Sequence, residues 1–193
     1  MKKILISFLP EVFPALLTGE KRFEYRSRIP EGEIEAYIYL SSPVKMITGR
    51  MRLGERLLIR DLLDNANDEI RCKLEKHMGE GSVYCSPILS LSLFDQPVSL
   101  DEARKLDAGF CAPQGFVYLE RYPALCVKLE KTDLSFYEIN PTCSREGLGL
   151  FSSEIKKLYP QRIEMPPYLN CFKDFRKPLA TPMVIDVKHN PGY

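Results

Sequence analysis

Short apolar runs and alternating apolar and polar residues dominate the first hundred residues. Alternation places every second side chain on the same face of an extended chain and is typical of half-buried strands. Glycine, proline and serine separate these runs, as expected at turns. The predicted strands are 4–8, 23–26, 35–40, a long extended segment 44–59 that bends near Gly49 or Gly54, 88–94, and a last strand at 125–129.

Helical spacing is clearest in residues 68–78, where Ile70, Leu74 and Met78 recur every four residues and Gly79 follows. Shorter helices are predicted at 11–18, 61–66 and 101–106, the last with Ser99 as its N-cap. Residues 113–119 are predicted to form a short helix or turn. Further along, the pattern predicts a helix at 152–158 and an edge strand at 183–187.

The size and charge of the chain limit its possible partners. It has 193 residues, of which 45% are hydrophobic and 27% charged, so one domain, or one domain with an extension, is expected. Because the net charge is +1, no global field attracts nucleic acid, and any such contact needs a local basic patch. This balance disfavours binding to a long duplex and favours a single-stranded or single-nucleotide ligand.

Metal, disulfide and membrane signals are weak in this sequence. The six cysteines are irregularly spaced without a C-x-x-C pair, and there are two histidines, so neither a metal site nor a cofactor is predicted. The apolar run at the N-terminus ends at Pro10, shorter than the ~7–15 residues of a signal peptide core. No run reaches the ~18 apolar residues of a membrane span. We therefore expect a cytoplasmic protein with reduced thiols and no membrane contact.

The densest group of charged residues begins where residues 11–18 end. It reads G-x-K-x-x-E-x-R, with Gly19, Lys21, Glu24 and Arg26 at the fixed positions. On an extended chain Glu24 and Arg26 project from one face, and Lys21 lies in the preceding turn. A carboxylate between two cations suits binding of a phosphate or polar heterocycle, or proton transfer in a site partly closed to water. Alternatively, this face is the solvated side of a strand.

This motif and five other segments resemble the ASCH domain family, a branch of the PUA-like superfamily. Gly19, Lys21, Glu24 and Arg26 match the family motif in full. An A-P-Q-x-F-x-Y segment of the family is similar to residues 112–118. The remaining similar segments are 4–10, 13–18, 36–44 and 47–51, so the resemblance covers about residues 3–120.

The resemblance implies a fold and a ligand class. The fold class is α+β: a small mixed β-barrel of the PUA-like/ASCH type with flanking helices and a cleft on one side, over residues 1–130. Residues 131–193 are then a C-terminal extension that packs on the barrel or forms an interface, through which a homodimer is one hypothesis. The implied ligand is RNA, a nucleotide or a nucleoside.

The resemblance also suggests hydrolysis. One branch of the family deacylates modified cytidine nucleosides, and another cleaves RNA. In the deacylase branch the motif lysine is catalytic, and a threonine three residues later is the nucleophile. Here Lys21 matches but residue 24 is Glu, so the threonine mechanism does not carry over.

Residues outside the motif complete the candidate site. Arg50, Arg52 and Arg56 form a basic stripe that could follow an RNA backbone. Alternatively, these charges lie on a solvated edge strand, where they disfavour pairing with a strand of another chain.

Hydroxyls of Ser41 and Ser42 could bind a phosphate or base edge, or simply end a strand. Tyr118 could stack on a base, or pack at a helix end. Phe116 is assigned to the core and His77 to the surface.

Two functions remain open at this stage. The first is an RNA- or nucleotide-binding module whose ligand contacts Lys21, Glu24, Arg26, Ser41, Ser42 and Tyr118. The second is a hydrolase in which Glu24 is the general acid/base and Lys21 stabilises developing negative charge. A closed pocket with Glu24 against Lys21 favours the enzyme, and an open groove continuous with the arginine stripe favours RNA binding. A third interpretation is that the motif only braces the barrel through an ion network.

Overall fold

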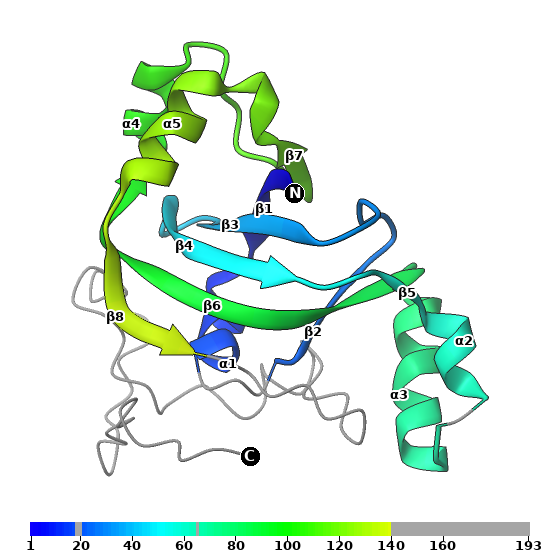
Figure 1. The fold of residues 1–193 in the computed structure, drawn as a ribbon. Coiled ribbons are helices and arrows are strands. Elements are labelled where there is room, and N and C mark those ends of the chain that lie inside the picture. Colours follow the sequence, from blue (N-terminus) through cyan, green and yellow to red (C-terminus); the bar gives the residue numbers. More distant parts are fainter. Residues whose placement is uncertain (18–20, 65, 140–193) are drawn as a thin grey trace.

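The computed structural model describes residues 1–17, 21–64 and 66–139, which form a mixed sheet of eight strands with helices on both sides (Figure 1). The path through the sheet is β2-β6-β4-β3-β1-β7, with β5 and β8 also pairing with β6. Only β1 and β3 run parallel among these pairs. The strands are β1 Lys2–Phe8, β2 Phe23–Arg26, β3 Ile34–Leu40, β4 Met46–Leu53, β5 Leu57–Leu58, β6 Tyr84–Ser99, β7 Phe116–Tyr118 and β8 Leu134–Ile139.

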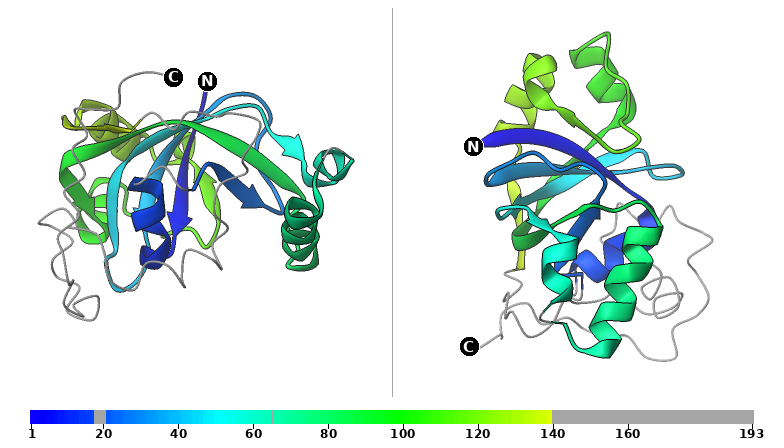
Figure 2. Two further views of the ribbon diagram at one scale, coloured as in Figure 1. Left: turned by 90° about the horizontal axis from the view of Figure 1, so that it is seen from below. Right: turned by 90° about the vertical axis from the view of Figure 1, so that its right-hand side faces the viewer.

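The sheet curls into a half-barrel, and both of its faces are buried (Figure 2). Along β3, Ile38 and Leu40 pack into a core that includes Phe13 of the first helix, while Tyr37 and Tyr39 pack into a second core. Successive side chains of β3 thus point to opposite faces of the sheet and pack into different cores. The predicted α+β fold with a small mixed barrel and flanking helices is confirmed.

The helices lie in three places: on each of the two faces of the sheet and beside one end of it (Figures 1 and 2). The curl of the sheet surrounds α1, whereas α4 and α5 cover the opposite face. The pair α2 and α3 lies beside β5, where Ile59 and Leu74 pack against Phe23 and Tyr25 of β2. The helices are η1 Pro10–Val12, α1 Phe13–Leu17, α2 Ile59–Leu63, α3 Asp68–Gly79, α4 Leu100–Leu106, η2 Leu119–Arg121 and α5 Pro123–Lys131.

Two predictions of secondary structure are wrong. The predicted strand 125–129 is part of α5, because Pro123 starts the helix and Leu125 and Leu129, four residues apart, are buried on one face. The predicted helix or turn at 113–119 contains β7, which pairs antiparallel with β1. Phe116, assigned to the core, is half-buried and packs against it.

The extended segment 44–59, predicted to bend near Gly49 or Gly54, is irregular near both glycines. The pairing of β4 with β6 shifts register between Ile47 and Gly49, and β4 ends just before Gly54. A side chain at Gly49 would put its Cβ 2.3 Å from the Ser92 carbonyl oxygen, so only glycine allows this approach.

β2 lies at one end of the strand order and leaves the half-barrel open beside β1. Beyond residue 130, β8 pairs with β6. The predicted helix 152–158, the predicted strand 183–187 and most of the extension 131–193 lie outside the described residues. Within the described residues no helix is long and apolar enough to cross a membrane.

Candidate functional site

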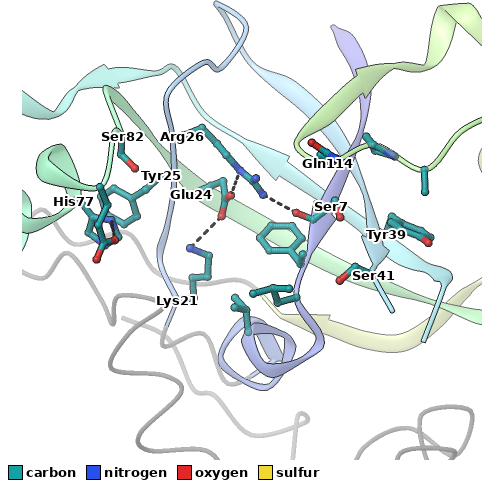
Figure 3. Close-up of a pocket in the computed structure, with 16 residues that line it drawn as sticks. Ser7, Lys21, Glu24, Tyr25, Arg26, Tyr39, Ser41, His77, Ser82 and Gln114 are labelled. Carbon is teal, nitrogen blue, oxygen red and sulfur yellow. Dashed lines mark hydrogen bonds and ion pairs between the residues drawn. The ribbon is translucent and has the colours of Figure 1, made fainter. Parts of the chain in front are cut away.

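The charged residues of the motif meet in a buried cluster at the edge of β2 (Figure 3). Glu24 lies between the two cations: its Oε2 is 3.0 Å from Lys21 Nζ, and its Oε1 accepts a 2.6 Å hydrogen bond from Arg26 Nε. Lys21 and Glu24 are each only 3% exposed. This burial contradicts the alternative that the charged face of the strand is solvated. Gly19 of the motif lies outside the described residues.

Arg26 ties the two sides of the barrel opening together. Its second guanidinium nitrogen donates a 2.6 Å hydrogen bond to the Ser7 carbonyl of β1, and the guanidinium lies 5.6 Å from the centre of the Phe8 ring. Because β2 and β1 are not neighbours in the sheet, this contact spans the gap between them. The motif is therefore built into the wall of the cleft.

The two cations keep Glu24 ionised. Burial by itself would raise the pKa of this carboxyl, but the nearby Lys21 and Arg26 outweigh that effect, and the net pKa lies below its ordinary value. Lys21 also donates a 2.8 Å hydrogen bond to the Phe23 carbonyl. An ammonium has three N–H donors, so the contacts seen among the described residues leave one for a ligand.

A cavity of about 540 Å³ opens beside this cluster. Such a volume is within the range of small-molecule sites. The wall combines the ion cluster with hydroxyls, an amide and apolar side chains. Its lining residues are Ser7, Phe8, Leu9, Val12, Lys21, Glu24, Tyr25, Arg26, Tyr39, Ser41, His77, Glu80, Ser82, Ala112, Pro113 and Gln114.

The predicted residues outside the motif divide between this cavity and other places. Ser41 lines the cavity, and its buried hydroxyl has no hydrogen-bond partner among the described residues. Ser42 does not line the cavity. Tyr118 lines a different depression together with Lys2 and Glu120, and its ring meets Phe116 edge-on. The structure therefore brings Lys21, Glu24, Arg26 and Ser41 together, but not Ser42 or Tyr118.

The arginine stripe also lies away from this cavity. Each arginine is paired with a carboxylate: Arg50 with Glu35, Arg52 with Glu33, and Arg56 with Glu31. These pairs offset the local positive charge. Of the two alternatives, the cavity with Glu24 against Lys21 is present, and the three arginines do not line it.

His77 is the functional candidate that the sequence prediction missed, because the prediction that it lies on the surface is wrong. The residue is 7% exposed, and its ring stacks on Tyr25 with centroids 4.5 Å apart and planes 6° apart. The available signal was its position three residues after the buried Leu74, which places both on one face of α3. Figure 3 shows His77 and Tyr25 across β2 from Glu24 and Arg26.

No group of three His, Cys, Asp or Glu side chains within residues 1–17, 21–64 and 66–139 could hold a metal ion. Cys72, Cys85, Cys111 and Cys126 are all unbridged thiols.

Comparison with known proteins shows which solved structures share this fold. No protein-family model matches the chain. The chain is similar to the crystal structure of ASCH from Zymomonas mobilis, with a TM-score of 0.53 and 22% identity over 68% of this chain and 96% of that one. A variant of the same protein gives a TM-score of 0.52. This chain has the ASCH fold.

Sequence similarity supports the resemblance to the ASCH family. A curated protein of Zymomonas mobilis named "ASCH domain-containing ribonuclease" is 28% identical over 130 residues, which is 62% of this chain and 86% of that protein. The matched length is close to that of the described half-barrel.

Proposed function

We propose that this chain binds RNA or an RNA-derived nucleotide in the cavity beside β2 and hydrolyses it there. The observation that carries this proposal is the buried contact of Glu24 with Lys21 at the wall of a 540 Å³ cavity that excludes the arginine stripe. A cavity of this kind suits chemistry on one nucleotide better than tracking of a long backbone. The ribonuclease name of the Zymomonas mobilis relative supports the same substrate class.

Lys21 is the proposed phosphate contact. Its remaining N–H donor can bind a non-bridging phosphate oxygen and stabilise the charge that develops there. The guanidinium of Arg26, whose side chain is 23% exposed, lies beside it at the cavity wall. The buried hydroxyl of Ser41 is a further donor or acceptor for the ligand.

Glu24 is proposed to position these cations rather than to move a proton. A carboxylate whose pKa is lowered by two ion pairs is a weak base at neutral pH. Its contacts instead fix the Lys21 ammonium and the Arg26 guanidinium. Ser42 and Tyr118 are not among the proposed ligand contacts.

The test is a panel of nucleosides, nucleotides and short single-stranded RNAs, assayed for binding and for product with wild type, Lys21→Ala and Lys128→Ala. Lys128 is an exposed lysine paired with Glu102 and serves as the charge-matched control. We expect Lys21→Ala to lose turnover by at least about 10²-fold, while Lys128→Ala keeps it. Binding without product would reduce the proposal to a binding module. If no ligand binds to wild type or to either variant and all three proteins are stable, the motif only braces the barrel.

A homodimer formed through residues 131–193 stays a separate hypothesis. Light scattering on the full chain across a range of concentrations tests it, because a homodimer gives twice the mass of 22.2 kDa.

A further inference from the structure

Hydrolysis or transesterification in this cavity needs a group that accepts the proton of the attacking nucleophile. Glu24 is poorly suited, since both of its oxygens face cations. Another titratable side chain at the same cavity is His77, which comes from α3 on the far side of β2. A histidine that faces a ligand cavity is a more suitable proton acceptor than an ion-paired carboxylate.

The Tyr25 ring connects His77 to the ion cluster. Lys21 Nζ lies 5.6 Å from the centroid of this ring, and the His77 ring stacks on it at 4.5 Å. The stack fixes the plane of the imidazole, and the cavity wall includes His77, Tyr25 and Lys21 together. Lys21 and His77 thus contact the same aromatic ring and line the same cavity, so one bound ligand could contact both side chains.

Burial, more than the surrounding charges, favours the neutral form of the His77 imidazole. Burial lowers its pKa most, and Lys21 and Lys76 lower it further, while Glu80 and Glu24 raise it. Glu80 Oε2 lies 3.8 Å from His77 Nδ1 and is largely exposed. The net pKa is below the ordinary value, so the ring is mostly unprotonated and able to accept a proton at neutral pH.

We propose that His77 accepts the proton of a ribose 2′-hydroxyl during RNA cleavage. This inference rests on the proposed function. The 2′-oxygen forms a bond to the adjacent phosphorus, and the bond from phosphorus to the 5′-oxygen breaks. The 2′-proton goes to an imidazole nitrogen, and water gives a proton to the leaving 5′-oxygen. The products are a 2′,3′-cyclic phosphate and a 5′-hydroxyl, and His77 returns its proton to water.

The 2′-hydroxyl is the proposed nucleophile because RNA supplies it next to the reacting phosphorus. Residue 24, in the middle of the cluster, is a carboxylate held by two cations and offers no hydroxyl. An internal nucleophile also needs no separate water to be bound and oriented.

The experiment uses the full chain, a short single-stranded RNA and its uniformly 2′-O-methylated copy. The key variant is His77→Phe, which keeps a ring against Tyr25 but has no proton acceptor. His77→Ala removes both features, and His189→Gln, which changes the other histidine of the sequence, is the control. Thermal melting establishes that each variant is folded.

We expect His77→Phe to lower kcat by at least about 10²-fold with little change in KM, while His189→Gln stays active. The acid limb of the wild-type kcat profile should lie below about pH 6.5 and disappear in His77→Phe. The 2′-O-methylated copy should bind without being cleaved, and the product should carry a cyclic phosphate.

Failure of this inference is distinguishable from failure of the proposed function. If wild type cleaves RNA but His77→Phe is equally active, His77 is not the proton acceptor; loss in His77→Ala alone would then mean that the ring only supports Tyr25. Cleavage of the 2′-O-methylated copy would overturn the proposed nucleophile. If wild type forms no product from any RNA, the proposed function fails and this inference fails with it.

Discussion

At the scale of single residues, the cluster of Lys21, Glu24 and Arg26 has a structural role that its contacts show, and the ligand-binding role proposed above. Taking charges out of water is costly, and only close partners and additional hydrogen bonds offset that cost. Here both Glu24 oxygens face cations, and backbone carbonyls of Phe23 and Ser7 accept from those cations. The same contacts hold two cations at the cavity wall.

Glu24→Gln should therefore destabilise the protein by about 3 kcal/mol, because it leaves the buried Lys21 and the partly buried Arg26 without their counter-charge. The measurement is urea unfolding of wild type and variant. Glu33→Gln is the matched control, since Glu33 pairs with Arg52 at the surface and should change the free energy of unfolding by less than about 0.5 kcal/mol. Equal effects of the two substitutions would contradict the structural role of the cluster.

The stability supplied by Glu24 should depend on pH in a defined direction. Its pKa is lower in the folded protein than in the unfolded chain, so the stabilisation is present above the unfolded value of roughly 4.3. It is lost as pH falls through the lower folded pKa, because the unfolded chain then binds the proton first. The difference in unfolding free energy between wild type and Glu24→Gln should thus be constant from pH 7 to about 5 and shrink below that. A difference that grows in acid would rule out this assignment.

At the scale of elements, the shape of the half-barrel depends on how β4 crosses β6. The register shift before Gly49 and the end of β4 at Leu53 allow the sheet to curl around α1. The backbone of β6 approaches Gly49 too closely for a side chain. A single glycine thus helps to define the curvature that leaves the opening beside β2.

Gly49→Ala should destabilise the protein by about 1–3 kcal/mol, because the new methyl group would meet the Ser92 carbonyl oxygen and the Leu93 backbone. Gly109→Ala is the matched control: nothing lies within 4 Å of its added Cβ, so a neutral or slightly stabilising effect is expected. Chemical denaturation of both variants tests the pair. An unchanged midpoint for Gly49→Ala would mean that the two strands can separate at no cost.

At the scale of the whole molecule, charges are paired on the sheet surface as well as in the cleft. Arg50, Arg52 and Arg56 each have a glutamate partner, so the surface beyond the cavity carries little excess positive charge. Together with a net charge of +1, this arrangement favours recognition of one nucleotide at the cavity. An RNA-backbone role for the three arginines stays a prediction.

Changing Arg50, Arg52 and Arg56 together to Gln should lower RNA affinity less than tenfold, because each charge is already offset. The measurement is binding of a short single-stranded RNA across a series of salt concentrations. Three full phosphate contacts would reduce the salt slope by about 2, so a much smaller change is expected. A reduction of that full size would show that the stripe follows the RNA backbone.

The sequence by itself determined most strands, the α3 helix and the central motif, because their signals are local. Alternation along 35–40 and the spacing of Ile70 and Leu74 reflect burial on one face of a single element. The same local rules failed at residues 125–129, where a short apolar run suits a strand or a helix and packing against the sheet selected α5.

Only the tertiary structure determined how deeply the charged side chains are buried and which distant groups they contact. The sequence placed Lys21, Glu24 and Arg26 near one another, but their burial depends on β1, which contributes the Ser7 carbonyl from 19 residues away. The spacing from Leu74 indicates that His77 lies on the buried face of α3, but it lines the cavity because α3 packs on β2, which only the tertiary structure shows. The pairing of Arg50 with Glu35 likewise depends on the register of β3 against β4. Long-range packing thus sets the burial of the motif cluster, the Ser7 partner of Arg26 and the place of His77 in the cavity wall.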